Sequence, residues 1–61
     1  MSIRAMRVNA NLTQEQVAEK LGITRLAYRN KENGKTEFKL KELLVMCELF
    51  GVELNDFAGC A

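Results

Sequence analysis

Histidine, proline and tryptophan are absent from this 61-residue sequence, which holds two cysteines, one tyrosine and three phenylalanines. Without histidine or a Cys-x-x-Cys pair the chain lacks the usual zinc ligand sets, so we expect no metal site. The carboxylates are scattered at helix-surface spacing, and neither cysteine stands beside a base in a recognisable motif. We therefore expect neither an enzyme nor a bound cofactor. No ligand-sensing domain is visible, so no small-molecule ligand is expected either.

Long apolar runs are also missing. No apolar stretch approaches the roughly 18 residues that a membrane-spanning helix needs, and residues 3–8 are too short and too charged for a signal peptide. We expect no membrane partner and a cytoplasmic protein of the prokaryotic cytosol or nucleoid, with a phage or mobile element as one source. Cys47 lies on a predicted apolar helix stripe and is interpreted as a core thiol. A disulfide with Cys60 is the alternative, which a reducing compartment disfavours.

No proline-rich linker, low-complexity run or internal repeat divides the chain, so residues 1–61 are expected to form one domain. A domain of about 60 residues buries only about 60% of its unfolded surface, which makes association with a second copy attractive. Apolar residues recur at helical spacing and no segment alternates as a strand would, which predicts an all-α fold. The expected helices span about residues 3–10, 14–21, 25–32, 40–50 and 54–58.

The segment 14–34 is the most informative part of the chain. Thr13 and Gln16 have the spacing of a capping box at the start of a helix, and Gly22 is suited to end that helix. Thr24 can cap a second helix at once. So few residues separate the two predicted helices that a sharp angle must lie between them. The pattern predicts a helix-turn-helix.

In these features the chain resembles the phage-repressor and Cro-type helix-turn-helix family, the xenobiotic-response-element (XRE) family. The resemblance covers about residues 3–57 and rests on Arg7, Thr13-Gln14, Val17-Ala18, Leu21-Gly22-Ile23, Glu32-Asn33-Gly34-Lys35, Leu43-Leu44 and Phe50-Gly51-Val52. It implies a compact five-helix bundle with a helix-turn-helix, like the DNA-binding domain of lambda repressor. The function it implies is that of a sequence-specific transcriptional regulator, a small homodimeric repressor bound to a pseudo-palindromic operator in double-stranded DNA.

The charges are unevenly distributed, although the net charge is only +1. Residues 25–41 hold six basic and two acidic residues, a local charge of +4, whereas residues 42–61 hold four acidic residues and no basic one. A basic face and an acidic end suit a molecule that docks in one orientation on phosphate. A solvated surface of mixed charge is the alternative interpretation.

Helix 25–32 is expected to read DNA, because its inward position is Tyr28 and its opposite side is left to solvent or a duplex. Arg25 can pair bidentately with guanine, Asn30 with adenine, and Leu26 can contact a thymine methyl group. The resemblance implies base contacts at these three positions. For the DNA backbone, Gln14 at the start of a helix can meet a phosphate, and the resemblance implies backbone contacts at Gln14 and in the loop that holds Asn33 and Lys35. Thr24 and Arg29 complete the expected set of backbone contacts.

The resemblance also implies a structural ion pair between Arg7 and Glu32, which would tie the first helix to the end of the third. A phosphate contact by Arg7 is the alternative. Lys31 stands where the family prefers a large apolar residue, so we expect its stem to pack while its ammonium reaches water. Phe38 and Lys39 replace the common Pro-Ser pair, so the helix that follows has no evident cap.

Phe38, Val45 and Leu49 follow i, i+7, i+11 spacing and suggest an apolar stripe that forms dimer contacts. Leu54 and Phe57, near the end of the chain, would extend it. Additional core is the alternative interpretation of the stripe.

A protein-interaction module of the same fold, without DNA binding, is the alternative to a DNA-binding regulator. The low net charge and the apolar Leu26 in the reading helix favour that alternative. A complete set of potential DNA contacts favours the regulator: Gln14, Arg25, Asn30, Asn33 and Lys35.

Overall fold

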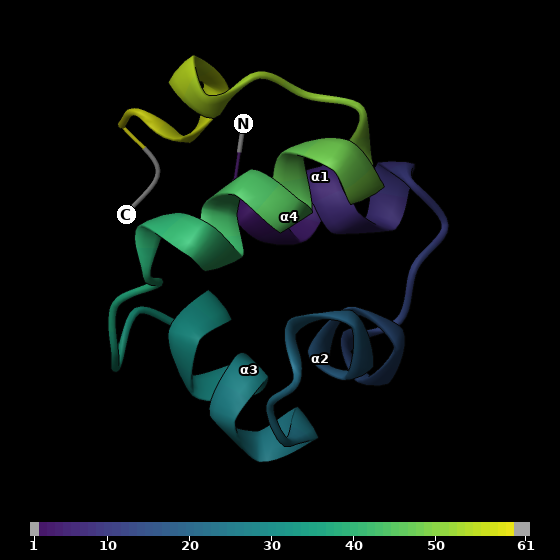
Figure 1. The fold of residues 1–61 in the computed structure, drawn as a ribbon, viewed down its shortest axis with the longest axis vertical. Coiled ribbons are helices and arrows are strands. Elements are labelled where there is room, and N and C mark those ends of the chain that lie inside the picture. Colours follow the sequence, from purple (N-terminus) through teal and green to yellow (C-terminus); the bar gives the residue numbers. More distant parts are fainter. Residues whose placement is uncertain (1, 60–61) are drawn as a thin grey trace.

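Four α-helices and one short 3-10 helix make up the computed structural model, which describes residues 2–59. They are α1 (Ile3–Asn9), α2 (Gln14–Leu21), α3 (Arg25–Glu32), α4 (Leu40–Phe50) and the 3-10 helix η1 (Leu54–Phe57) (Figure 1). No strand occurs among the described residues, in agreement with the predicted all-α class. The fifth α-helix was wrongly predicted, because η1 is one turn closed by i→i+3 hydrogen bonds, such as Ala58 N–H to the Asn55 carbonyl.

Local capping groups set the ends of α2 and α3, where these helices form the helix-turn-helix. Thr13 Oγ1 accepts a hydrogen bond from the Gln16 N–H at 3.1 Å, and the Gln16 side chain accepts from the Thr13 N–H at 2.8 Å. Gly22 follows α2 with φ at 72°, a left-handed conformation that a residue without Cβ enters cheaply. Thr24 Oγ1 accepts from the Ala27 N–H at 3.1 Å, so α3 begins at once. The predicted capping box and tight turn are therefore confirmed.

One hydrophobic core joins all five elements. Its buried members are Met6 of α1, Val17 and Ala18 of α2, Tyr28 of α3, Met46 of α4 and Phe57 of η1. Burying an apolar side chain such as valine or methionine stabilises a fold by roughly 1.5–3 kcal/mol, so these core residues help to hold each element in place. The Tyr28 ring also packs against Phe38 from the α3–α4 loop, with 5.8 Å between ring centroids.

Most of the apolar residues expected at a dimer contact lie against this core. Phe57 is a core member, and Phe38 and Leu49 are partly buried and pack against it. Val45 and Leu54 remain exposed, at 37% and 42%. The structure thus favours the core interpretation for Phe38, Leu49 and Phe57.

The two cysteines differ in what can be described. Cys47 of α4 is partly buried and packs against the core, as its place on the apolar stripe predicts. Cys60, named above as its alternative disulfide partner, lies outside the described residues.

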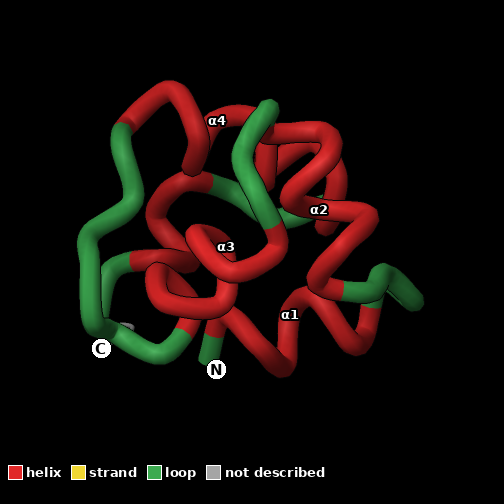
Figure 2. Tube along the Cα trace, turned by 90° about the horizontal axis from the view of Figure 1, so that it is seen from below, coloured by secondary structure: helices red, strands yellow, loops and turns green. Residues whose placement is uncertain are grey.

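Helix α3 lies at one side of the molecule, with its inner face on the core and its outer face open. In the view from below, α3 is central, with α4 on one side and α1 on the other (Figure 2). Tyr28 points inward and is fully buried, whereas Leu26 is 65% exposed on the outer face. The other helices therefore support α3 from behind and leave one long side of it accessible.

Candidate nucleic-acid interface

The carboxylate of Glu32, at the end of α3, collects four side-chain hydrogen bonds from three helices. Arg7 of α1 donates through Nε to Oε2 at 2.8 Å and through Nη2 to Oε1 at 3.3 Å. Gln14 Nε2, at the start of α2, donates to Oε1 at 3.0 Å, and Tyr28 Oη donates to Oε2 at 2.7 Å. We refer to these four side chains as the Glu32 hub. The hub fixes the start of α2 against the end of α3.

The Glu32 hub is almost closed to solvent, because the Arg7 and Glu32 side chains are only 10% and 2% exposed. Burial opposes ionisation of Glu32, yet hydrogen bonds from Arg7, Tyr28 and Gln14 outweigh it and hold the pKa of Glu32 below its ordinary value. The hydrogen bond to Glu32 likewise raises the pKa of Arg7. Burial and the Glu32 carboxylate together raise the pKa of Tyr28. At neutral pH the hub is therefore a charged pair with a neutral tyrosine.

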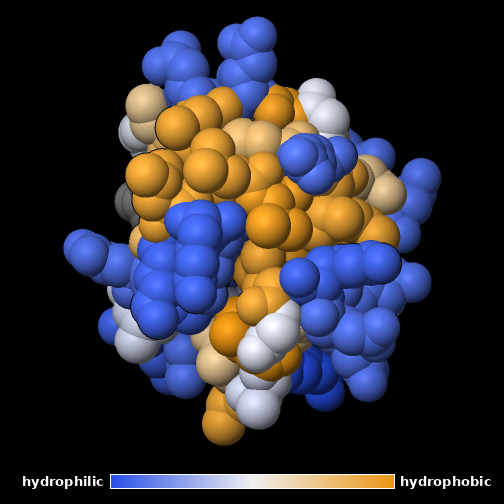
Figure 3. All heavy atoms as spheres, in the orientation of Figure 1, coloured by the Kyte–Doolittle hydropathy of each residue, from blue (hydrophilic) through white to orange (hydrophobic). Residues whose placement is uncertain are grey.

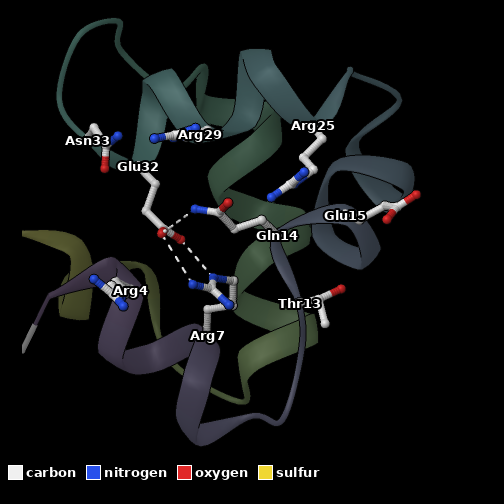
Figure 4. Close-up of a pocket in the computed structure, with 9 residues that line it drawn as sticks. All are labelled: Arg4, Arg7, Thr13, Gln14, Glu15, Arg25, Arg29, Glu32 and Asn33. Atoms are coloured by element: carbon white, nitrogen blue, oxygen red, sulfur yellow. Dashed lines mark hydrogen bonds and ion pairs between the residues drawn. The ribbon is translucent and has the colours of Figure 1, made fainter.

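An open cleft of about 660 Å³ lies directly over this hub, between α1, the start of α2 and one flank of α3. Its lining residues are Arg4, Arg7, Thr13, Gln14, Glu15, Arg25, Arg29, Glu32 and Asn33. In Figure 4, Arg4 and Arg7 approach from α1 and Arg25 and Arg29 from α3, with Gln14 between them. We call this hollow the arginine cleft. With four arginines against two glutamates, it suits an anion.

The arginine cleft brings together some of the residues predicted to contact DNA and leaves others outside. Arg25, Arg29, Gln14 and Asn33 line it. Leu26 lies on the neighbouring surface, where it lines a smaller hollow with Arg25 and Arg29. The remaining predicted contacts, Thr24, Asn30 and Lys35, do not line the cleft.

The three predicted contacts outside the cleft differ in their exposure to solvent and in their hydrogen bonding. Thr24 is exposed, but its hydroxyl oxygen is occupied by the N–H of Ala27 as the cap of α3. Asn30 is partly buried, one turn along α3 from Leu26, so it shares the outer face. Lys35 is exposed in the loop that follows α3.

Arg4 was missed as a site residue in the sequence. It is exposed on α1 and lines the arginine cleft opposite α3. The signal that could have found it is its spacing of three residues from Arg7, which places both arginines on one face of a helix. The role of the Tyr28 hydroxyl was also missed, because Tyr28 was interpreted only as an inward residue.

A second ion pair fixes the loop between α3 and α4. Lys31 Nζ lies 3.1 Å from Glu42 Oε1 and donates to the Glu37 carbonyl at 2.9 Å, while the Lys39 N–H donates to the same Glu42 oxygen at 2.8 Å. The ammonium is 5.9 Å from the centroid of the Phe38 ring, in cation–π range. This clamp holds the segment in which Lys35 lies.

The prediction that the Lys31 ammonium reaches water is wrong, because Glu42 and the Glu37 carbonyl hold it and its side chain is only 13% exposed. Burial opposes ionisation of Glu42, but the Lys39 N–H and Lys31 outweigh it and hold the pKa of Glu42 below its ordinary value. Glu42 also supplies the cap that the sequence of α4 did not reveal, since its carboxylate accepts the N–H of Lys39 just before the helix.

Two other features are absent from residues 2–59 of the chain. None of its helices is long and apolar enough to cross a membrane. No group of three or more His, Cys, Asp or Glu side chains between residues 2 and 59 is placed to hold a metal ion.

Residues 3–57 match the model of a protein family described as helix-turn-helix. The chain is also 37% identical over 54 residues to an uncharacterized HTH-type transcriptional regulator of Methanocaldococcus jannaschii, over 88% of this chain and 82% of that protein. No solved structure shows significant similarity to the chain. The matched range includes all four α-helices and every residue that lines the arginine cleft.

Proposed function

Because the chain belongs to the helix-turn-helix family, we propose that it regulates transcription by binding double-stranded DNA, with α3 in the major groove. The observation that carries this proposal is the pairing of two surfaces on α3. Its outer face offers exposed side chains to base edges, and its flank opens into the arginine cleft, where a phosphate chain can lie. One helix can thus contact both bases and backbone.

The proposed base contacts are Arg25, Leu26 and Asn30. Arg25 has the two parallel donors that match guanine O6 and N7, and Asn30 has the donor and acceptor that match adenine. Leu26 has no polar atom to offer, but its 65% exposure suits contact with a thymine methyl group. A half-site with at least one guanine and one adenine is the expected recognition sequence.

The proposed backbone contacts are Gln14, Thr24, Arg29, Asn33 and Lys35, and the structure suggests how Gln14 can serve two roles. Its side-chain amide carries two N–H groups, and the one bonded to Glu32 Oε1 leaves the other available in the arginine cleft. The first N–H groups of α2 also point outward at a helix N-terminus and favour an anion. Gln14 can therefore hold the hub and meet a phosphate together.

The working unit in this proposal is a homodimer that acts as a repressor on a pseudo-palindromic operator in the prokaryotic cytosol or nucleoid. A two-fold axis would place two copies of α3 about one turn of DNA apart, roughly 34 Å. A repressor of this kind would act by occupying its operator, so its cellular concentration would set the extent of repression.

Selection of bound sequences from a random duplex pool tests the proposal and identifies the operator at the same time. Enrichment of a two-fold-related sequence is the expected result, and binding should weaken as salt rises. The second candidate function is a protein-interaction module, which the exposed Leu26 and the net charge of +1 favour. A protein that retains no duplex even at low salt would exclude the regulator and support that second candidate.

A further inference from the structure

The outer face of α4 combines exposed apolar residues with one charge at each end. Leu40, Leu44 and Val45 are 62%, 50% and 37% exposed, and Lys41 and Glu48 are exposed beside them. Lys41, Leu44, Val45 and Glu48 follow i, i+3, i+4, i+7 spacing, so they share one helix face. Figure 3 shows a broad apolar band across the side of the molecule on which α4 lies, interrupted by hydrophilic groups. We call these five residues the α4 face.

Both charges of the α4 face lie at the unfavourable ends of their helix. A helix N-terminus carries partial positive charge and a C-terminus partial negative charge. Lys41 nevertheless lies in the first turn of α4 and Glu48 in its last turn. Within residues 2–59 neither side chain has an ion-pair or hydrogen-bond partner. Within the described chain, no ion pair or hydrogen bond therefore offsets the unfavourable interaction of these two charges with the helix dipole.

We propose that the α4 face binds the α4 face of a second copy of this chain, with the two helices antiparallel. In that arrangement Lys41 meets Glu48 of the second copy, and Glu48 meets Lys41 of the second copy. At the two-fold axis, Leu44 packs against Val45 of the second copy, and Val45 packs against Leu44 of the second copy. The antiparallel helix dipoles then attract each other, both ion pairs form, and an apolar surface is removed from water.

A second copy fits this face better than an unrelated protein, because the face is complementary to itself. A two-fold contact requires that each residue find its partner on the same surface of the other copy. Along α4 the face presents a basic residue, then two apolar residues, then an acidic residue. When the second helix runs in the opposite direction, its acid meets the base of the first helix and its apolar pair meets the apolar pair. This surface replaces the stripe predicted from the sequence, of which Phe38 and Leu49 are packed on the core and only Val45 lies on the α4 face.

The orientation of the proposed dimer also suits a single duplex. In Figure 1, α3 lies below α4, so rotation about an axis in the plane of the picture and perpendicular to α4 leaves both α3 helices on the lower side of the α4 pair. Both reading helices then face the same side of the dimer. The two-fold contact gives a surface to the homodimer of the proposed function, and only its orientation rests on DNA binding; the contact itself can be measured without DNA.

Charge reversal tests the contact, because all the residues involved are exposed and the substitutions need not disturb the core. Sedimentation equilibrium without DNA, up to millimolar concentration, is expected to show reversible dimers of the wild-type chain. Lys41→Glu and Glu48→Lys should each weaken dimerisation roughly tenfold or more, since each creates two like-charge contacts per dimer. The double variant Lys41→Glu/Glu48→Lys should restore it. Glu15→Lys, which changes the same charge in the arginine cleft, is the matched control and should leave dimerisation unchanged.

Three outcomes would overturn the inference: a wild-type monomer at all concentrations, single variants that dimerise as the wild type does, or a double variant weaker than both singles. DNA binding of the wild-type chain is measured separately on the selected duplex. A dimer with charge rescue but without DNA binding would remove the proposed function and leave the α4 contact standing. A DNA complex that holds two copies, and whose affinity neither charge reversal changes, would remove the α4 contact and leave the proposed function standing.

Discussion

Tyr28 Oη donates a 2.7 Å hydrogen bond to Glu32 Oε2, one turn further along α3. The ring of the same tyrosine is fully buried in the hydrophobic core. A single side chain therefore links the core to the Glu32 hub. This link makes the orientation of α3 depend on both apolar packing and a polar network that reaches α1 and α2.

Replacement of Tyr28 by phenylalanine should test the polar part of this link alone. The ring and its packing remain, while Glu32 loses one of its hydrogen bonds and keeps those from Arg7 and Gln14. We expect a loss of about 1–3 kcal/mol in the free energy of unfolding, because a buried hydrogen bond to a charged group is removed. Urea denaturation of Tyr28→Phe measures this loss. An unchanged midpoint would show that the hydroxyl contributes no net stability.

The Arg7–Glu32 pair should be energetically coupled. Arg7→Met and Glu32→Gln are each expected to cost on the order of 3 kcal/mol, since each leaves a nearly buried group without its charged partner. The double variant should cost less than the sum of the two. Thermal and urea unfolding of all four proteins completes the cycle. Strictly additive losses would mean that the contact contributes nothing beyond its separate parts.

Acid should destabilise the fold through Glu32 and Glu42. The pKa of each is lower in the folded chain than its ordinary value of 4.5, so the folded state favours the charged form. Their contribution is therefore complete above that ordinary value and is lost as the pH falls through the lower folded pKa. Unfolding free energies from pH 7 to pH 2 should show this fall, with a shallower dependence in Glu32→Gln. Equal pH dependence in the variant and the wild type would contradict the assignment.

Arg4 should contribute to DNA affinity without contributing to sequence preference. If about six phosphates are neutralised per dimer, log K should fall with log salt at a slope near −5. Arg4→Ala should weaken binding to every sequence equally and reduce the steepness of that slope by about 2 per dimer. Lys20→Ala is the matched control, because it removes one cation outside the arginine cleft; since Lys20 lines a groove with Lys41 and Val45 of the α4 face, its dimerisation is measured beside its DNA binding. Identical slopes for Arg4→Ala and wild type would remove Arg4 from the interface.

Base-reading residues should differ from positioning residues on a panel of single-base operator variants. Arg25→Ala or Asn30→Ala should relax preference at one position per half-site, at a cost of roughly 1–3 kcal/mol on the preferred base. Lys35→Ala should weaken binding to all sequences about equally. Binding curves across the panel separate the two classes. A uniform loss for Arg25→Ala would show that this arginine reads no base.

The parts of the fold that could be predicted from the sequence are those set by neighbouring residues. The capping box of Thr13 and Gln16 and the left-handed Gly22 depend only on groups within a few positions, so the ends of α2 were predicted correctly. The core position of Tyr28 followed from helical periodicity. These features require no knowledge of how the helices pack.

The features that escaped prediction depend on residues far apart in the chain. Lys31 and Glu42 are on different helices, and only packing shows that an ion pair replaces the expected solvated ammonium. Arg4 belongs to the arginine cleft only because α1 lies opposite the flank of α3. Phe38 and Leu49 matched the spacing of a surface stripe, but the loop before α4 folds Phe38 onto Tyr28.

The shared position of Gln14, bonded to Glu32 and facing the arginine cleft, has a genetic consequence. If the chain is the repressor proposed above, a screen for lost repression should recover substitutions at Arg7 and Glu32 beside those at the reading residues, although neither hub residue is proposed to touch a base. Growth temperature would distinguish the hub variants from the variants of the reading residues. Hub alleles should regain repression in cooler cultures, where the weakened fold persists, whereas alleles of Arg25 or Asn30 should stay defective at every growth temperature.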